Sequence, residues 1–365
     1  MKTSITNFQL LTLILTMGLA GCTSLSSQSA TKAYPHNQPI QQIADKAVVD
    51  AKKSLHPKAI SVVVAEPKTG KILAMCGWRK ETIPQLMNES ELTALTMFEP
   101  GSTFKPMVAV AALEKGVINP KTKINCGNGL IRYQGKLIKD HMPIGESTVE
   151  EILAKSSNVG AFWMALMLKD TDYYHCIRRF GFGEKTGMSL PWEFRGLVNP
   201  PSKWLELSKA HMSFGQSVAV TPIQLTMAYC ALANGGNLMR PVVRDQTPKL
   251  VRRVCSESTA NLVKNALQKT ISTEGAAPMA RVKGVTAGGM AGTVHAISPE
   301  GGYLPDQNWT LFAGFFPVNQ PRYVVVVVVD EAMLPPSKNF GRLVAAPIFS
   351  EIAGKITALQ GARFE

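Results

Sequence analysis

The sequence is poor in the patterns that hold metals and disulfide frameworks. It has six cysteines and six histidines among 365 residues, with no His-Glu-x-x-His motif and no Cys-x-x-Cys pair, the spacings that bring zinc ligands together. If Cys22 is modified, five cysteines remain, and an odd number argues against a complete disulfide framework. We therefore expect no metal site, and we expect Cys76 and Cys230, which lie in apolar runs, to be core residues.

Acidic residues are also in short supply. The chain has 26 Asp and Glu against 39 Lys and Arg, a formal net charge of +13. This balance favours anionic surfaces or polymers as partners, although a dispersed, solvated charge is the simpler explanation of most of it. No nucleic-acid recognition module is recognisable. We expect no nucleic-acid partner and favour anionic lipid head groups or acidic cell-wall polymers.

No apolar run reaches the roughly 20 residues of a membrane-spanning helix. The first 21 residues carry one Lys and a short apolar stretch at 10–15, followed by Leu19-Ala20-Gly21-Cys22, which is typical of a secretory signal. The small residues before Cys22 resemble the lipobox of bacterial lipoproteins, whose cysteine is lipidated and becomes the new N-terminus. An uncleaved membrane anchor is the alternative. Either way, we expect an exported protein tethered to a membrane.

The composition changes after Cys22. Residues 23 to about 40 are rich in Ser, Thr, Gln and Pro, as in a linker. We therefore expect a signal peptide at 1–21, a lipid-anchored linker at 22–55 and one folded domain at 56–358.

The expected domain begins and ends with strands and has helices between them. Two apolar segments joined through Pro67-Lys68-Thr69-Gly70 predict a β-hairpin, and the six consecutive valines at 324–329 predict a strand buried on both faces. This order is typical of an α+β fold with helices on both sides of an antiparallel sheet. The expected strands are 60–65, 71–75, 286–296, 309–316 and 323–329, and the expected helices begin at 102, 150, 173, 221, 258 and 343.

A hydroxyl and an amine stand one helical turn apart where the first of these helices begins. In the stretch Gly101-Ser102-Thr103-Phe104-Lys105, Ser102 and Lys105 share one helical face, so the amine can reach Ser102 Oγ. If burial lowers the pKa of Lys105, its amine can take the serine proton and create an acyl-accepting nucleophile. Backbone N–H groups of the first turn also favour the oxyanion that attack generates.

A second polar element, Ser156-Ser157-Asn158, follows 54 positions after Ser102. It comes after Ser147-x-x-Glu150, which predicts a capping box at a helix start. The stretches Ser29-Ala30-Thr31-Lys32 and Ser337-Lys338-Asn339 match the same short patterns, but they lie in a polar linker and in a Pro-flanked loop. Order and spacing therefore favour the pair Ser102 and Ser156.

A third element stands late in the chain, on a predicted strand. Ser-x-x-Lys, Ser-x-Asn and Lys-Thr-Gly form the motif set of penicillin-binding proteins and related β-lactamases, and Met290-Ala291-Gly292-Thr293 stands where Lys-Thr-Gly-Thr would be. The chain resembles the transpeptidase domain of class B penicillin-binding proteins over roughly residues 56–358. Further landmarks occur in that family's order: Phe180-Gly181-Phe182-Gly183-Glu184-Lys185-Thr186-Gly187, Ser213-Phe214-Gly215-Gln216, Val220-Thr221-Pro222-Ile223-Gln224-Leu225 and Ala233-Asn234-Gly235-Gly236.

The resemblance implies a β-lactamase/transpeptidase-like fold with an α-helical subdomain, and roles for the motif residues. Ser102 is implied to be the acylated nucleophile, Lys105 its base, Ser156 the proton relay to the leaving amine, and Asn158 the clamp for the substrate amide. Gly292 and Thr293 belong to the substrate-binding strand, where the Thr293 N–H and the Ser102 N–H would form the oxyanion hole. No cofactor is implied.

The altered third motif lacks the lysine whose ammonium attracts the substrate carboxylate and lowers the pKa of the relay serine, and a methionine thioether does neither. His295 is one candidate for a substitute cation, since it lies on the same strand face as Thr293. Arg281 and Lys283, just upstream, are others. Met290 as a core-filling residue in a binding-only descendant is a comparable interpretation.

We therefore expect a D,D-transpeptidase that acts on peptidoglycan stem peptides, binds β-lactams, reacts through an acyl-serine intermediate, and faces the periplasm as a membrane-anchored lipoprotein, with cell-wall synthesis proteins as further candidate partners. Two alternatives remain open. One is a pseudo-enzyme that binds cell-wall peptides or partner proteins. The other is a β-lactamase or β-lactam sensor, although the sequence has no Glu-x-x-Leu-Asn stretch of the class A deacylation site.

Overall fold

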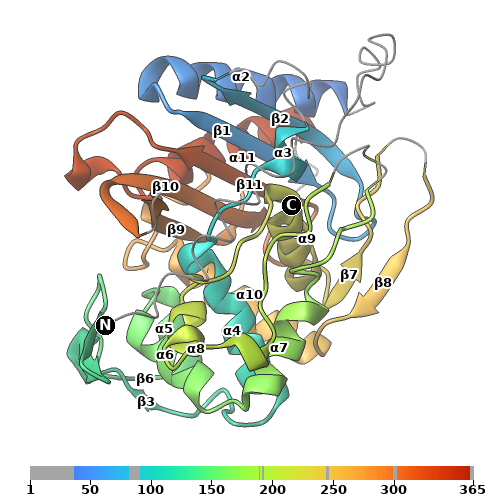
Figure 1. The fold of residues 1–365 in the computed structure, drawn as a ribbon. Coiled ribbons are helices and arrows are strands. Elements are labelled where there is room, and N and C mark those ends of the chain that lie inside the picture. The colour runs from blue at the N-terminus through green and yellow to red at the C-terminus, as the bar shows by residue number, and fades with distance from the viewer. Residues whose placement is uncertain are drawn as a thin grey trace, which may run out of the picture.

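The computed structural model describes residues 37–361 except 82–90, 189, 191–192, 244–245 and 299–301. At its centre lies a five-stranded antiparallel sheet with the order β2-β1-β11-β10-β9, so that β9 forms one edge (Figure 1). The sheet confirms the expected α+β class. Its strands are β1 (Ala59–Ala65), β2 (Ile72–Arg79), β9 (Gly288–Ile297), β10 (Tyr303–Phe316) and β11 (Tyr323–Asp330).

The valine run forms the central strand β11, as predicted. Every residue of this strand is buried, because the strand lies between β1 and β10 and both faces of the sheet are covered. Alternate valines belong to two separate cores: Val324, Val326 and Val328 to one, and Val325, Val327 and Val329 to the other. The period-2 geometry of a strand explains how one uninterrupted apolar run serves both cores.

One face of the sheet is covered by α2 (Gln38–Leu55) and α11 (Ala345–Gln360) (Figure 1). Helix α2 corrects the expected linker at 22–55. The second half of that segment, residues 38–55, is a helix of the folded domain. Asn37 caps the helix by accepting a hydrogen bond from Ile40 N at 3.3 Å, and Ile40, Ala44 and Val48 are buried against the sheet. Their helical spacing gives the segment an apolar face, which a linker does not need.

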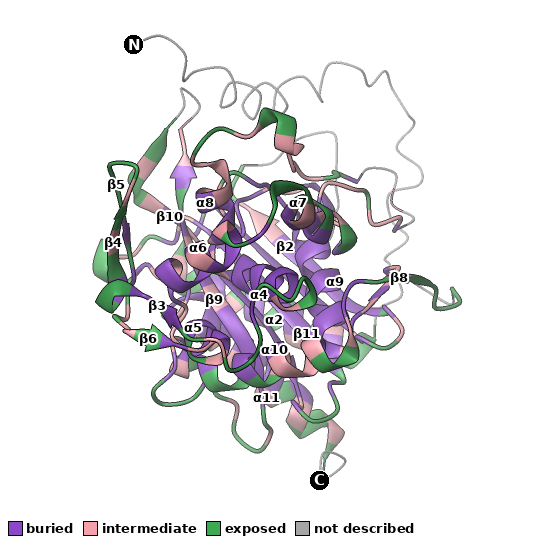
Figure 2. Ribbon diagram, turned by 90° about the horizontal axis from the view of Figure 1, so that it is seen from below, coloured by how far each residue is buried: buried purple, intermediate pink, exposed green. Residues whose placement is uncertain are grey.

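The opposite face packs against α9 (Pro222–Ala233) and α10 (Glu257–Thr270), and α4 (Lys105–Glu114) packs in turn against α10. Every residue of α9 is buried, so it is the central helix of this side (Figure 2). Its predicted start is confirmed: Thr221 and Gln224 form a capping box and Pro222 lies in the first turn. This arrangement satisfies the free N–H groups of a buried helix end.

The remaining elements surround these layers, and most of them form the smaller helical part of the domain on the α4 side of the sheet. The expected capping box at Ser147 and Glu150 is wrong by one residue: Thr148 is the N-cap and pairs with Glu151, because Ser147 is still in a strand. The elements are α3 (Leu92–Leu95), β3 (Ile124–Asn125), β4 (Leu130–Tyr133), β5 (Lys136–Lys139), β6 (Glu146–Ser147), α5 (Val149–Ala154), α6 (Asn158–Leu166), α7 (Asp170–Arg179), α8 (Ser208–Ser213), β7 (Asn237–Met239) and β8 (Leu250–Arg253).

The expected signal peptide and Cys22 lie outside the described residues. Among the helices that are described, none is long and apolar enough to cross a membrane. The five cysteines of the described part are all buried free thiols, and the same residues contain no group of three or more His, Cys, Asp or Glu side chains that could hold a metal ion.

Candidate active site

Ser102 lies in a short 3₁₀ helix, Gly101–Phe104, that runs directly into α4. The α-helix therefore begins at Lys105, three residues later than the sequence indicated. Pro106 lies in the first turn of α4, where its missing N–H costs nothing. Gly101 has a φ of +54°, a left-handed conformation that glycine adopts readily. The glycine thus allows the sharp entry that leaves Ser102 partly exposed.

The 3₁₀ helix that carries Ser102 packs directly on the edge strand β9. A Cβ added to Gly101 would lie 2.5 Å from Val294 Cγ2 and 3.6 Å from Thr293 N, and one added to Gly292 would lie 2.9 Å from Pro100 O. Both glycines are therefore needed for this close approach. The structure thus brings together Ser102 and Thr293, the two residues whose backbone N–H groups were expected to form an oxyanion hole.

Lys105 is fully buried, which is rare for a lysine without a carboxylate partner. Burial lowers the pKa of its amine from 10.5 to about 7, and the negative charge of Asp140 opposes this shift. The amine hydrogen-bonds Ser156, with its carbonyl O and its Oγ as acceptors, the latter at 3.1 Å. Among the described residues, the hydrogen bonds of the Lys105 amine therefore go to Ser156 rather than to Ser102. A base poised near neutral pH is what general-base catalysis requires.

Ser156 occupies the junction between α5 and α6. Its φ of +54° is unusual for a residue other than glycine and marks a locally strained position. The next residue, Ser157, caps α6 by accepting a hydrogen bond from Gly160 N at 2.9 Å. The chain reversal at Ser156 lets its carbonyl O and Oγ face Lys105 together, so the two predicted elements form one polar cluster.

Asp140 organises this cluster, and sequence reasoning missed it. Its carboxylate is buried and accepts hydrogen bonds from Ser157 Oγ at 2.6 Å, Asn158 N at 2.6 Å and Val159 N at 2.9 Å. Two of these donors are free N–H groups at the start of α6, where a negative charge is favoured. Asp140 follows β5 by one residue and belongs to no recognisable motif, so no signal in the sequence points to it.

Asn158, the first residue of α6, faces a small cavity. Its Nδ2 donates to Lys139 O at 2.8 Å, which fixes the orientation of the side-chain amide. The cavity has a volume of about 280 Å³, and its lining includes Lys136, Asn158, His211 and Gln216. Gln216 belongs to the landmark Ser213-Phe214-Gly215-Gln216. This landmark and the element Ser156-Ser157-Asn158, which were identified separately in the sequence, therefore line one cavity.

The structure separates the candidate replacements for the third-motif lysine. Met290 is fully buried in the core on the α4 side of the sheet, whereas His295 is exposed with its ring 6.5 Å from the ring of Tyr303. Arg281 precedes the start of β9, and its carbonyl accepts a hydrogen bond from Ser350 of α11 at 2.5 Å. The backbone of Arg281 therefore lies against α11, and Lys283 follows it two residues later in the chain.

A second, larger cavity lies beside Glu99, three residues before Ser102. It has a volume of about 390 Å³, and its lining includes Glu99, Trp204 and His211. Glu99 accepts hydrogen bonds from Ser217 N at 2.7 Å and from Tyr303 Oη at 3.0 Å. Burial raises the pKa of Glu99 from 4.5 to about 7.

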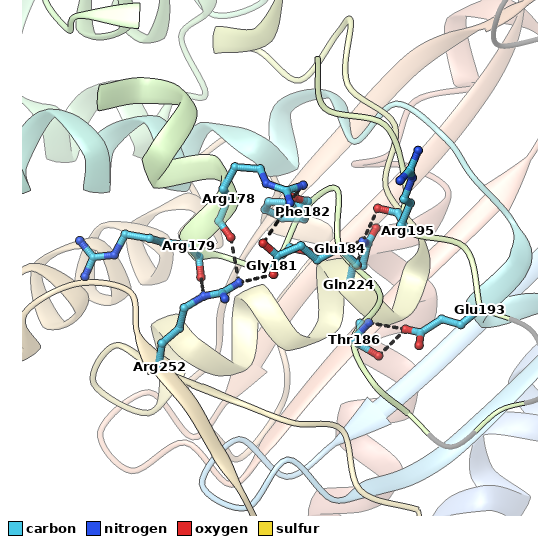
Figure 3. Close-up of polar contacts among 10 residues, drawn as sticks. All are labelled: Arg178, Arg179, Gly181, Phe182, Glu184, Thr186, Glu193, Arg195, Gln224 and Arg252. Atoms are coloured by element: carbon cyan, nitrogen blue, oxygen red, sulfur yellow. Dashed lines mark hydrogen bonds and ion pairs between the residues drawn. The ribbon is translucent and has the colours of Figure 1, made fainter. Parts of the chain in front are cut away.

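A network of polar contacts connects residues between Arg178 and Arg195 with Gln224 and Arg252 (Figure 3). Glu184 lies between Arg178 at 3.0 Å and Arg252 at 2.7 Å, and Gln224 Nε2 donates to Glu184 O at 2.7 Å and Arg195 O at 2.8 Å. The segment held in this way pairs through Leu197 with Ala219, and the adjacent Val220 pairs with Phe98. The network therefore supports residues 98–101, the segment that leads to Ser102.

Comparison with known proteins places this architecture in a family. Residues 60–354 match the family model described as "Penicillin binding protein transpeptidase domain". Peptidoglycan D,D-transpeptidase FtsI of Escherichia coli K12 is 31% identical over 303 residues, which cover 81% of this chain and 50% of that protein. Probable peptidoglycan D,D-transpeptidase PbpC of Pseudomonas aeruginosa is 32% identical over 331 residues, covering 88% and 57%. The chain thus spans about half the length of these curated relatives.

A solved structure agrees with this assignment. The transpeptidase domain of Burkholderia pseudomallei penicillin-binding protein 3, in its apo form, superposes with a TM-score of 0.81 at 29% identity and covers 94% of this chain and 99% of that one. Sequence family, fold and motif order agree, and the chain belongs to the penicillin-binding protein transpeptidase domain family.

Proposed function

We propose that this chain is a serine D,D-transpeptidase that acts on peptidoglycan stem peptides ending in D-alanyl-D-alanine and is acylated by β-lactams. The observation that carries the proposal is the buried Lys105, whose pKa is lowered to about 7 by burial and whose amine hydrogen-bonds Ser156 Oγ one turn from Ser102. A neutral amine that is hydrogen-bonded to one hydroxyl group and lies one helical turn from another can move protons in both halves of an acyl transfer.

In this mechanism, Ser102 Oγ attacks the carbonyl carbon of the penultimate D-alanine while neutral Lys105 takes the hydroxyl proton. The backbone N–H groups of Ser102 and Thr293 stabilise the resulting oxyanion. The C–N bond then breaks, and the proton reaches the departing D-alanine amine through Ser156. An acceptor amine next attacks the acyl-Ser102 ester, loses its proton to Lys105 and regenerates the serine.

One observation favours the binding-only alternative: the side chain at position 290 is a methionine packed entirely in the core. If the site lacks a cation for the substrate carboxylate, binding and acylation weaken by about 1.5–3 kcal/mol, the contribution of a charge-assisted contact. That loss corresponds to about one to two decades in rate. An enzyme slowed to this extent is still an enzyme, so activity has to be measured directly.

The test is the reaction of the purified protein with a synthetic peptide that ends in D-alanyl-D-alanine, in the presence of an amine acceptor. We expect release of D-alanine and formation of the acceptor-linked peptide, and neither product with Ser102→Ala. Peptide binding without D-alanine release would instead identify a pseudo-enzyme. Many turnovers of penicillin hydrolysis per protein would identify a β-lactamase.

We also propose that the chain is exported, lipidated at Cys22 and held at a membrane with its domain facing the periplasm, where cell-wall synthesis proteins are further partners. The support is the stretch Leu19-Ala20-Gly21, which places small residues directly before Cys22, and the polar composition that follows. Mass spectrometry of the mature protein should show an acylated Cys22, and Cys22→Ser should abolish partitioning into detergent. A mature chain that begins at another residue contradicts this proposal.

A further inference from the structure

The edge strand of the candidate site carries no lysine or arginine. Strand β9 reads Gly-Gly-Met-Ala-Gly-Thr-Val-His-Ala-Ile and contains neither Lys nor Arg. Met290 is buried in the core, Arg281 and Lys283 precede the strand, and the backbone of Arg281 lies against α11. An ammonium or guanidinium group for an anionic substrate must therefore come from another segment that reaches this strand.

The loop Phe340–Arg342 is such a segment, because it lies directly on β9 beside Thr293. Gly341 N donates a hydrogen bond to Thr293 Oγ1 at 2.9 Å. A Cβ on Gly341 would lie 2.1 Å from Gly292 O and 2.7 Å from Leu311 O, so only glycine allows this contact. Arg342 thus directly follows Gly341, the residue that hydrogen-bonds Thr293, and the Thr293 N–H is expected to stabilise the oxyanion.

The side chain of Arg342 extends toward the loop that organises Ser156 and Asn158. Its guanidinium carbon lies 5.8 Å from the centre of the Phe340 ring, and the same ring lies 5.8 Å from the ring of His141, the residue after Asp140. Burial and the nearby charge of Arg342 both lower the pKa of His141. Arg342 therefore lies near both β9 and the Asp140 loop.

Arg342 also has unused hydrogen-bonding capacity. Its Nε is buried and has no hydrogen-bond partner, and Arg342 forms no ion pair with any residue that the structure describes. A buried donor without a partner is unfavourable, and an incoming anion would relieve it. The planar guanidinium matches a carboxylate, which it can bind with two parallel hydrogen bonds.

We propose that Arg342 is the cation that binds a carboxylate of the donor substrate at this site, in the role that a lysine at position 290 would have. The inference rests on the proposed transpeptidase function. The carboxylate is either the C-terminal one of the peptide, which corresponds to the ring carboxylate of a penicillin, or one carried on the acyl side chain.

The test compares acylation rates of three penicillins with wild-type protein and with Arg342→Gln. Benzylpenicillin has the ring carboxylate, its methyl ester lacks it, and carbenicillin adds a carboxylate to the side chain. We expect Arg342→Gln to lower the second-order rate for benzylpenicillin by about 10- to 100-fold, the effect of losing one charge-assisted contact, and to change the rate for the ester much less. A loss that is specific to carbenicillin assigns Arg342 to a side-chain carboxylate instead. Equal losses for all three ligands, or no loss, overturn the proposal.

Matched variants separate charge from folding. Arg342→Lys should retain part of the rate because it keeps the charge without the fork geometry, while Arg281→Ala, which removes an exposed cation on the α11 side, should have no effect. The dissociation constants of N-acetyl-D-alanyl-D-alanine and of its C-terminal amide provide a second readout that needs no catalysis. If wild-type protein is never acylated, the proposed function fails. Carboxylate-dependent binding that weakens in Arg342→Gln still supports the role of Arg342, and its absence contradicts it.

Discussion

Replacing Lys105 with methionine should make the protein more stable at pH 6 while it abolishes acylation. Burial lowers the pKa of the amine from 10.5 to about 7, a difference of about 3.5, which corresponds to about 5 kcal/mol at 1.36 kcal/mol per pKa unit. The unfolded chain holds its proton up to about pH 10.5, so below pH 7 folding bears the full cost of a buried ammonium. Methionine has a similar shape and carries no charge.

The gain is smaller than 5 kcal/mol because the two hydrogen bonds to Ser156 are lost. At about 0.5–1.5 kcal/mol each for neutral groups, they offset about 1–3 kcal/mol and leave a net stabilisation of about 2–4 kcal/mol at pH 6. As pH rises from about 7 to 10.5, the cost of the ammonium disappears from wild type. The order of stability of the two proteins should then reverse, with Lys105→Met less stable than wild type by about 1–3 kcal/mol near pH 10.5.

The assay is urea unfolding of both proteins at pH 6, 8 and 10.5, with acylation by fluorescent penicillin measured in parallel at pH 8. The exposed Lys121→Met is the control for the loss of one charge. Acylation by Lys105→Met should fall at least about two decades, the effect of losing a general base. A variant that is less stable than wild type at pH 6, or a stability difference that is the same at every pH, would refute this reasoning.

Two further predictions follow from the buried carboxylates. The wild-type acylation rate should rise with pH through the pKa of Lys105 near 7. Asp140→Asn should move the midpoint of this rise to lower pH, because the charge of Asp140 raises the pKa of Lys105. A midpoint that is the same in Asp140→Asn and wild type contradicts the assignment of Lys105 as the base. Glu99 is protonated in the fold below about pH 7 and in the unfolded chain only below about 4.5. Wild type should therefore lose up to about 3 kcal/mol relative to Glu99→Gln between pH 4.5 and 7, as measured by urea midpoints at pH 4.5 and 8. A stability difference between wild type and Glu99→Gln that is the same at pH 4.5 and 8 would refute the raised pKa of Glu99.

The sheet and its central helix could be predicted from the sequence because their signals are local. Six consecutive valines in β11 and the cap Thr221 with Pro222 depend only on neighbouring residues. Helix α2 was missed although it has a pattern of its own, with Asn37 as a cap and apolar residues at helical spacing from Ile40. The Ser- and Gln-rich composition around its start favoured a linker instead.

The candidate site was predictable where it follows short motifs and hidden where it depends on the fold. Ser102 and Lys105 are three residues apart, and the structure keeps them in adjoining helical turns. Asp140 reaches the cluster across 17–19 positions, and Gly341 approaches Thr293 across 48. No spacing rule covers such distances, because loop conformation and strand packing set them.

The most direct test of the central claim is the site of β-lactam attachment. Wild-type protein, Ser102→Ala and Ser156→Ala are incubated with benzylpenicillin at pH 8, where most Lys105 amines are neutral given the lowered pKa of about 7, and intact mass and peptide mapping follow. We expect one adduct per wild-type chain, located on Ser102, none on Ser102→Ala, and slower formation on Ser156→Ala. A folded wild-type protein that stays unmodified at high penicillin concentration, or an adduct on another residue, would contradict the assignment of Ser102 as the nucleophile.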